Sequence, residues 1–184
     1  MTRPAGLSSE ERVRFEEAML PHLDAAYNLA RYLLRDADRA QDAVQDSFLR
    51  AMTYFGGYRG GDSRAWLLAI VRNACFDQIE RDRRRSGDAE FNEEIHVSDQ
   101  AEPSPEATLR ARVASETVER ALEGLPPELR EAVVLRELEG LSYKEIAHVA
   151  GVPVGTVMSR LARGRERLHR ALGAGGGEED GDAL

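Results

Sequence analysis

The strongest constraint on the fold is a helical repeat of apolar residues in two separate blocks of the chain. From residue 12 to residue 85, apolar side chains recur at the three- and four-residue spacing of a buried helix face. One such set consists of Leu20, Leu23, Tyr27, Ala30 and Leu34. No segment shows the two-residue alternation of a strand. The chain is therefore predicted to be all-α.

Helix-capping residues and glycines divide this first block into a three- or four-helix bundle. Asp36 or Asp38 is expected to cap a second helix. Its inner face would carry Val44, Phe48, Ala51 and Phe55. Residues 56–61 contain four glycines and predict a loop. Asp62 or Ser63 would then cap a long third helix, whose apolar surface would be formed by Trp66, Leu67, Ile70, Val71 and Ala74.

An acidic segment separates the two helical blocks. Residues 86–109 contain seven acids, two prolines and no Lys or Arg, which predicts a flexible linker. Residues 173–184 are Gly-rich with four further acids, and are expected to form a disordered tail. The net charge is −8, but the rest of the chain holds 22 acids against 25 Lys and Arg. The overall sign therefore does not exclude binding to DNA, which depends on local charge.

Several classes of protein are disfavoured by what the sequence lacks. It contains no apolar run of membrane-spanning length and no signal peptide, so we expect a cytoplasmic protein without membrane insertion. The single cysteine, Cys75, and four scattered histidines predict neither a disulfide nor a metal site. There is no Gly-rich phosphate loop or nucleophile elbow. We therefore expect no enzymatic activity, no cofactor and no small-molecule substrate.

The second block contains a helix-turn-helix pattern. A helix is expected to start at or just after Pro127 and to end at Gly140. Residues 142–145, Ser-Tyr-Lys-Glu, form a capping box for the next short helix. Gly151 would end that helix, and Val157 would anchor the following one. The pattern favours DNA reading over the alternative, a helical hairpin with a solvated basic face.

These segments resemble the extracytoplasmic-function (ECF) sigma factors of bacterial RNA polymerase, in the sigma-70 family. Residues 135–147 (LRELEGLSYKEIA) and 152–161 (VPVGTVMSRL) are similar to their fourth conserved region. Residues 42–51 (DAVQDSFLRA) resemble the polymerase-docking helix of their second region. The resemblance implies two small helical domains, region 2 at residues 10–85 and region 4 at residues 110–172, joined by the acidic linker.

The resemblance also implies site residues. Contact with core polymerase would involve Asp42, Gln45, Asp46, Leu49 and Arg50. The minus-10 DNA element would be read by Tyr58, Arg59, Asn73, Asp77, Arg81 and Arg84. The minus-35 element would be read by Lys144, Thr156, Met158, Ser159, Arg160, Arg163 and Arg165. From the residues alone, Asn73 and the arginines that end the third helix can also be ordinary solvated side chains.

The implied partners are core RNA polymerase, promoter DNA and an anti-sigma factor. On the polymerase, the contacts would be the clamp helices of the largest subunit and the flap of the second-largest subunit. Met158 departs from the family, many members of which place a basic residue there, so the minus-35 preference is expected to differ or to depend more on Ser159 and Arg163. Two alternatives remain: a helix-turn-helix regulator of an operator, and a sigma mimic that titrates an anti-sigma factor.

Overall fold

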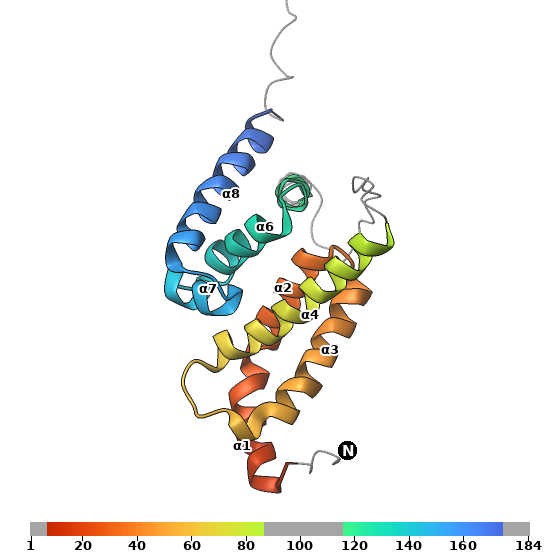
Figure 1. Cartoon of the computed structure of the whole chain (residues 1–184), viewed down its shortest axis with the longest axis vertical. Coiled ribbons are helices and arrows are strands. Elements are labelled where there is room, and N and C mark those ends of the chain that lie inside the picture. The colour runs from red at the N-terminus through yellow and green to blue at the C-terminus, as the bar shows by residue number, and fades with distance from the viewer. Residues whose placement is uncertain (1–6, 87–115, 175–184) are drawn as a thin grey trace, which may run out of the picture.

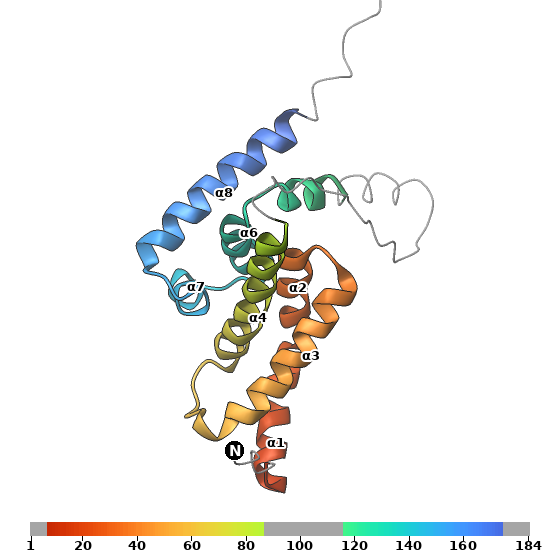
Figure 2. The same ribbon diagram turned by 45° about the vertical axis from the view of Figure 1, so that its right-hand side comes forward.

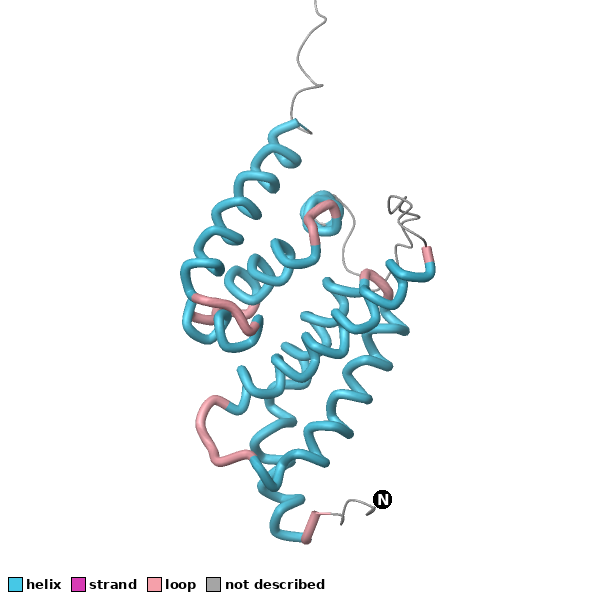
Figure 3. The backbone as a smooth tube through the Cα atoms, viewed as in Figure 1, coloured by secondary structure: helices cyan, strands magenta, loops and turns pink. Residues whose placement is uncertain are grey.

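The structure, a computed structural model, describes residues 7–86 and 116–174. Within these two ranges every regular element is a helix, and no strand is present (Figure 3). The predicted all-α fold is therefore confirmed. Residues 87–109 of the predicted linker and residues 175–184 of the predicted tail lie outside the described ranges.

The first half of the chain is a bundle in which α2, α3 and α4 pack along one another, with α1 at one end (Figure 1). Two short 3-10 turns, Leu20–His22 and Phe55–Gly57, connect its helices. The bounds of the helices are α1 Ser9–Met19, α2 Leu23–Leu34, α3 Ala37–Tyr54 and α4 Ser63–Arg85.

The second half begins with a helical segment at residues 116–123 and continues through shorter helices into a long final one. The bounds of these helices are α6 Pro127–Val133, α7 Tyr143–Ala150 and α8 Val154–Ala174. A π-helical turn, Val134–Leu138, directly follows α6. Helix α8 therefore extends two residues into the predicted tail, which was expected to begin at residue 173. Helix α6 begins at Pro127, as predicted.

Helix starts in the first half follow local capping chemistry. Of the alternative caps, Asp36 accepts from the backbone N–H of Arg39 at 2.9 Å, and Asp62 accepts from that of Ala65 at 2.9 Å. The predicted apolar face of the first helix is only partly right, because Leu20 and Leu23 are exposed. The 3-10 turn at Leu20–His22 changes the rotation per residue, so these two side chains leave the buried face.

A cluster of aromatic rings holds the loop between α3 and α4. Phe15 of α1 meets Phe55 edge to face, with ring centroids 5.2 Å apart. Tyr58 stacks on Phe55 at 5.5 Å and contacts Trp66 of α4 at 5.1 Å. The Tyr58 hydroxyl also donates to the carbonyl of Gly61 at 2.9 Å. These contacts fix the first part of the loop, so the backbone around Arg59 starts from a defined position.

The two halves share one hydrophobic core, a packing that sequence analysis did not predict. Helix α7 packs on α4, and α6 packs on α2, so that α6 and α7 lie between α8 and the first bundle in both views (Figures 1 and 2). Polar contacts cross the same interface: Glu139 accepts from the side-chain amide of Asn28 and pairs with Arg64. Residues more than a hundred positions apart in the chain are thus neighbours.

None of the helices in the described part of the chain is both long and apolar enough to cross a lipid bilayer. Within residues 7–86 and 116–174, no group of His, Cys, Asp and Glu side chains is placed to hold a metal ion.

Candidate nucleic-acid interface

Helices α7 and α8 form the helix-turn-helix that the sequence predicts. The Ser142 N–H donates to the Glu145 carboxylate at 2.6 Å, and the Glu145 N–H donates to Ser142 Oγ at 3.3 Å. These hydrogen bonds with Ser142 hold the pKa of Glu145 below its ordinary value. Gly151 has a φ of 66°, the left-handed conformation that a glycine adopts without steric cost. Val157 is fully buried and anchors α8 as expected.

The position of α8 is also set by a close approach to α6. A Cβ atom placed on Gly164 would lie 2.7 Å from Cγ2 of Val133 and 3.5 Å from the carbonyl oxygen of Leu129. Only glycine allows the two helices to approach this closely. The contact lies near the middle of α8, so it fixes the direction of the predicted recognition helix against the rest of the second half.

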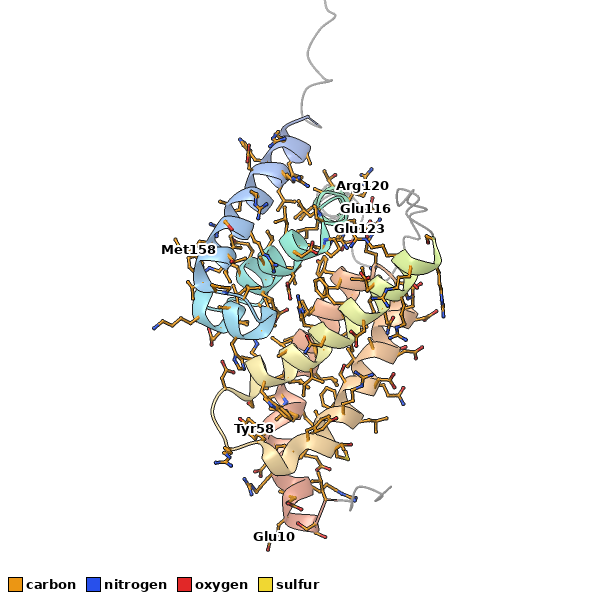
Figure 4. The ribbon with its side chains drawn as sticks, in the orientation of Figure 1. Glu10, Tyr58, Glu116, Arg120, Glu123 and Met158 are labelled. Atoms are coloured by element: carbon orange, nitrogen blue, oxygen red, sulfur yellow. The ribbon has the colours of Figure 1, made fainter. Side chains whose placement is uncertain are left out.

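The predicted minus-35 residues do not all lie on one face. Lys144, Met158, Ser159 and Arg163 are exposed, and Thr156 is half-buried. Met158 lies on α8 at the outer edge of the molecule (Figure 4). Arg165 is exposed too, but its guanidinium pairs with Glu137 at 2.6 Å.

Arg160 turns toward the protein interior. Its Nη1 lies 3.5 Å from Oε2 of Glu131, while Arg72 of α4 donates from Nε to Oε1 of the same carboxylate at 2.7 Å. The Glu131 side chain is fully buried, and burial raises its pKa above the ordinary value while both arginines act against the rise. A single carboxylate thus joins the predicted recognition helix to the first half of the chain.

The predicted minus-10 residues of α4 form one exposed strip. Asn73, Asp77, Arg81 and Arg84 follow the helical spacing and are all exposed. The Asn73 side-chain oxygen accepts from Arg72 Nη1 at 3.3 Å, which leaves the amide N–H₂ directed away from that contact. Arg84 pairs with Glu80 at 3.1 Å, an exposed pair on the same helix.

The interface between the halves lies next to both predicted DNA-reading sets. A cavity of about 420 Å³ is lined by Tyr58, Arg59 and Trp66 from the first half and by His148 from α7. The Tyr58 loop is visible at the lower left in Figure 4. A second cavity, of about 800 Å³, is lined by Asp77 and by residues of both halves. In this arrangement the second half covers part of the surface beside the minus-10 set.

The predicted polymerase-binding residues share the outer face of α3. Asp42, Gln45, Asp46 and Arg50 are exposed, and Leu49 is 56% exposed. Met52, an apolar residue that sequence reasoning missed, is exposed beside Leu49 and enlarges the apolar part of this face. Its position three residues after Leu49 was the available signal. A mixed polar and apolar surface of this kind is typical of protein interfaces.

Arg130 is a second residue that sequence analysis overlooked. Its side chain is buried and donates to carbonyls of both halves: those of Tyr32 and Leu33 at the end of α2, and those of Leu122, Glu123 and Leu125 before α6. The signal in the sequence was its spacing, three and four residues before the apolar Val133 and Val134. Cys75, by contrast, is a buried side chain without charge, and burial raises the pKa of its thiol to about 12.

Comparison with known families matches both halves of the chain. Residues 19–85 match the model of Sigma-70 region 2, and residues 115–168 match that of Sigma-70 region 4. The RNA polymerase sigma-H factor of Pseudomonas aeruginosa is 36% identical over 166 residues, which cover 86% of each protein. The ECF RNA polymerase sigma factor SigE of Mycolicibacterium smegmatis is 35% identical over 86% of this chain, which spans 61% of that relative's length.

Solved structures give the same result. The sigma factor RpoE of Bartonella quintana, in complex with the anti-sigma factor NepR, has a TM-score of 0.72 at 29% identity over 87% of this chain and 97% of that one. CnrH, in complex with the cytosolic domain of CnrY, has a TM-score of 0.63 at 27% identity over 89% and 90% of the two chains. Members of this family are DNA-directing subunits and not enzymes. By sequence, order of regions and fold, the chain belongs to the ECF sigma factors of the sigma-70 family.

Proposed function

We propose that this sigma factor docks on core RNA polymerase through the outer face of α3. The observation that carries the proposal is the exposure of Asp42, Gln45, Asp46 and Arg50 together with the apolar Leu49 on one helix face. Charged groups orient an encounter, and apolar side chains supply the area that holds a complex. Such a complex would form in the cytoplasm, where core polymerase is found.

The same proposal assigns the two DNA elements to the two halves. The Tyr58–Arg59 loop and the exposed strip of α4 would contact the minus-10 element, and α8 would enter the major groove at the minus-35 element. The covered side of the Tyr58 loop becomes free only when α7 leaves α4, whereas Arg160 stays paired with Glu131 of α6, in its own half. Promoter binding therefore requires the two halves to separate on the polymerase.

An anti-sigma factor is the third partner in the proposal. One structural relative, RpoE, was solved in complex with the anti-sigma factor NepR, and another, CnrH, was solved with the cytosolic domain of CnrY. A protein that binds both halves of this chain at once would hold α6 and α7 packed against the first bundle, as in this structure. It would also cover the surfaces that polymerase and DNA require.

The test is run-off transcription with purified core polymerase on a library of promoter fragments. We expect transcripts that depend on the chain, and lose at least tenfold in yield when Asp46 and Leu49 are changed together to Ala. A Glu17→Ala variant, at an exposed position of α1 outside the proposed binding surfaces, is the control for surface changes in general. Chain-dependent transcripts that are unaffected by the α3 double variant would contradict the docking surface.

Two alternatives predict different results. An operator-binding regulator would bind duplex DNA as a dimer without polymerase. A sigma mimic would bind an anti-sigma factor but would give no transcripts and no DNA complex.

A further inference from the structure

One buried carboxylate of the second half is shared by two arginines, one from each half of the chain. Oε1 of Glu131, on α6, accepts from Nε of Arg72 on α4 at 2.7 Å. Oε2 of the same side chain lies 3.5 Å from Nη1 of Arg160 on α8. The three side chains thus carry two positive charges and one negative charge. When the second half leaves α4, Glu131 keeps Arg160, whereas Arg72 remains on α4 and loses this carboxylate.

Arg72 finds no replacement carboxylate one turn away on its own helix. The residues at these positions, three and four before or after it, are Leu68, Ala69, Cys75 and Phe76. The ring of Phe76 instead supports the guanidinium, whose carbon lies 3.9 Å from the ring centroid. Both side chains belong to α4, so this contact does not depend on the second half. Separation of the halves would therefore leave a positioned cation whose opposite charge has moved away.

Asn73, a residue of the predicted minus-10 set, contacts the same guanidinium. Nη1 of Arg72 donates to the side-chain oxygen of Asn73 at 3.3 Å, while Nε donates to Glu131. Arg72 therefore lies at the border between the exposed strip of α4 and the second half. Any base that Asn73 contacts is attached to backbone phosphates, and a guanidinium binds phosphate oxygens through charge-assisted hydrogen bonds. Glu131 and such a phosphate would require the same guanidinium, so each excludes the other.

We infer that Arg72 exchanges partners: it pairs with Glu131 while the halves are packed together, and with a backbone phosphate of the minus-10 strand once they part. The inference rests on the proposed placement of the minus-10 element on α4, and it names a means of regulating that site. In the packed arrangement, the second half neutralises a cation that the DNA requires. On the promoter, the phosphate replaces the lost ion pair and offsets part of the free energy of separation.

The test compares Arg72→Gln with Arg64→Gln in the complete chain. Each substitution removes an α4 guanidinium that pairs with a carboxylate of the second half, Glu131 in one case and Glu139 in the other. Arg64 lies nine residues before Asn73, half a turn away from it around α4, and is therefore the matched control. In the free chain, both variants should increase the radius of gyration measured by small-angle X-ray scattering. Circular dichroism should show the helix content of the parent chain in both, since glutamine retains an amide donor.

Promoter binding separates the two variants. The chain with core polymerase is titrated with a labelled promoter fragment whose non-template minus-10 strand is unpaired, at several salt concentrations. The slope of the logarithm of the binding constant against the logarithm of the salt concentration should become about 0.7 shallower in Arg72→Gln, the loss of one phosphate contact to a single strand. Arg64→Gln should keep the slope of the parent chain. Arg72→Lys, which retains the charge, should restore it.

Neutral phosphates locate the contact on the DNA. Each phosphate of the unpaired strand is replaced in turn by methylphosphonate, which removes its charge. One replacement should weaken binding of the parent chain and of Arg64→Gln about fivefold, the effect of an ion pair at a solvated surface. The same replacement should have no effect on Arg72→Gln.

Three outcomes would overturn the inference. They are an unchanged radius of gyration in Arg72→Gln, a salt slope equal to that of the parent chain, and an equal response of the two proteins to every methylphosphonate. A parent chain that binds no promoter fragment in the presence of core polymerase would instead overturn the proposed function.

Discussion

Replacement of Arg130 by Met should cost this protein a large part of its stability, since the arginine ties together three segments. The side chain is only 3% exposed. Its Nη1 donates to the carbonyl of Tyr32 at 3.0 Å, across the interface between the halves. Its Nε donates to the carbonyl of Leu122 at 2.9 Å, and Nη2 donates to that of Leu125 at 2.7 Å. Methionine fills a similar volume but offers no donor.

The magnitude follows from the carbonyls that lose their donor. A buried polar group without a partner costs about 1–3 kcal/mol, and a hydrogen bond from a charged group contributes about 1.5–3 kcal/mol. The affected carbonyls belong to the last turn of α2 and to the segment before α6, and water can reach some of them after the change. We therefore expect the free energy of unfolding to fall by about 3–5 kcal/mol. Arg130→Lys should recover only part of this, because one ammonium group cannot reproduce the planar fork.

The assay is urea denaturation followed by circular dichroism. The parent chain should unfold in one transition, because its halves share a core, whereas Arg130→Met should unfold earlier and less cooperatively. Arg170→Met is the matched control: that guanidinium is exposed and pairs only along its own helix with Glu166, so the change should cost about 0.5 kcal/mol or less. A loss below about 1 kcal/mol for Arg130→Met would refute the reasoning.

Three more predictions follow from buried groups. Gly164→Ala should lower the melting temperature, because the new Cβ would lie 2.7 Å from Cγ2 of Val133. Gly155→Ala should raise the melting temperature, because the space around Gly155 is open and alanine favours the helix. Equal shifts of the melting temperature would contradict the close crossing of α8 and α6. Iodoacetamide should label Cys75 only after denaturation, because its thiol is buried with a pKa of about 12; rapid native labelling would disprove this. The pKa of Glu131 is raised in the folded state, so between pH 4.5 and that pKa the folded protein binds more protons than the unfolded chain, and the free energy of unfolding should fall as pH rises. Glu131→Gln should reduce this dependence of the free energy of unfolding on pH. Urea titrations at several pH values that give the same dependence for both proteins would count against the prediction.

Local features of this protein were predictable from the sequence. The capping box at Ser142 and the left-handed turn at Gly151 depend on residues within a few positions of each other, and both formed as expected. Asp36 and Asp62 were each one of two candidate caps, the others being Asp38 and Ser63. The structure was needed to decide which residue of each pair caps its helix. The site residues of α3 and α4 came from the family resemblance, and their exposure agrees with helical spacing.

The contacts between the halves were not predictable in the same way. Arg130 binds the carbonyl of Tyr32, 98 positions earlier in the chain, and Glu131 is paired from both α4 and α8. Such contacts depend on which helix faces pack together, and no local pattern encodes that choice. The inward turn of Arg160 has the same origin: its sequence position fits a DNA contact, but a buried carboxylate lies within reach.

The shared core has a consequence for how strongly promoters are occupied. A ligand that binds only the separated halves sees an apparent affinity reduced by the fraction of molecules that are already open. In the proposed mechanism, binding of promoter DNA therefore includes the free energy of parting α7 from α4. Substitutions inside this contact would alter transcript yields at every promoter by a common factor, although none of the altered side chains touches a nucleotide.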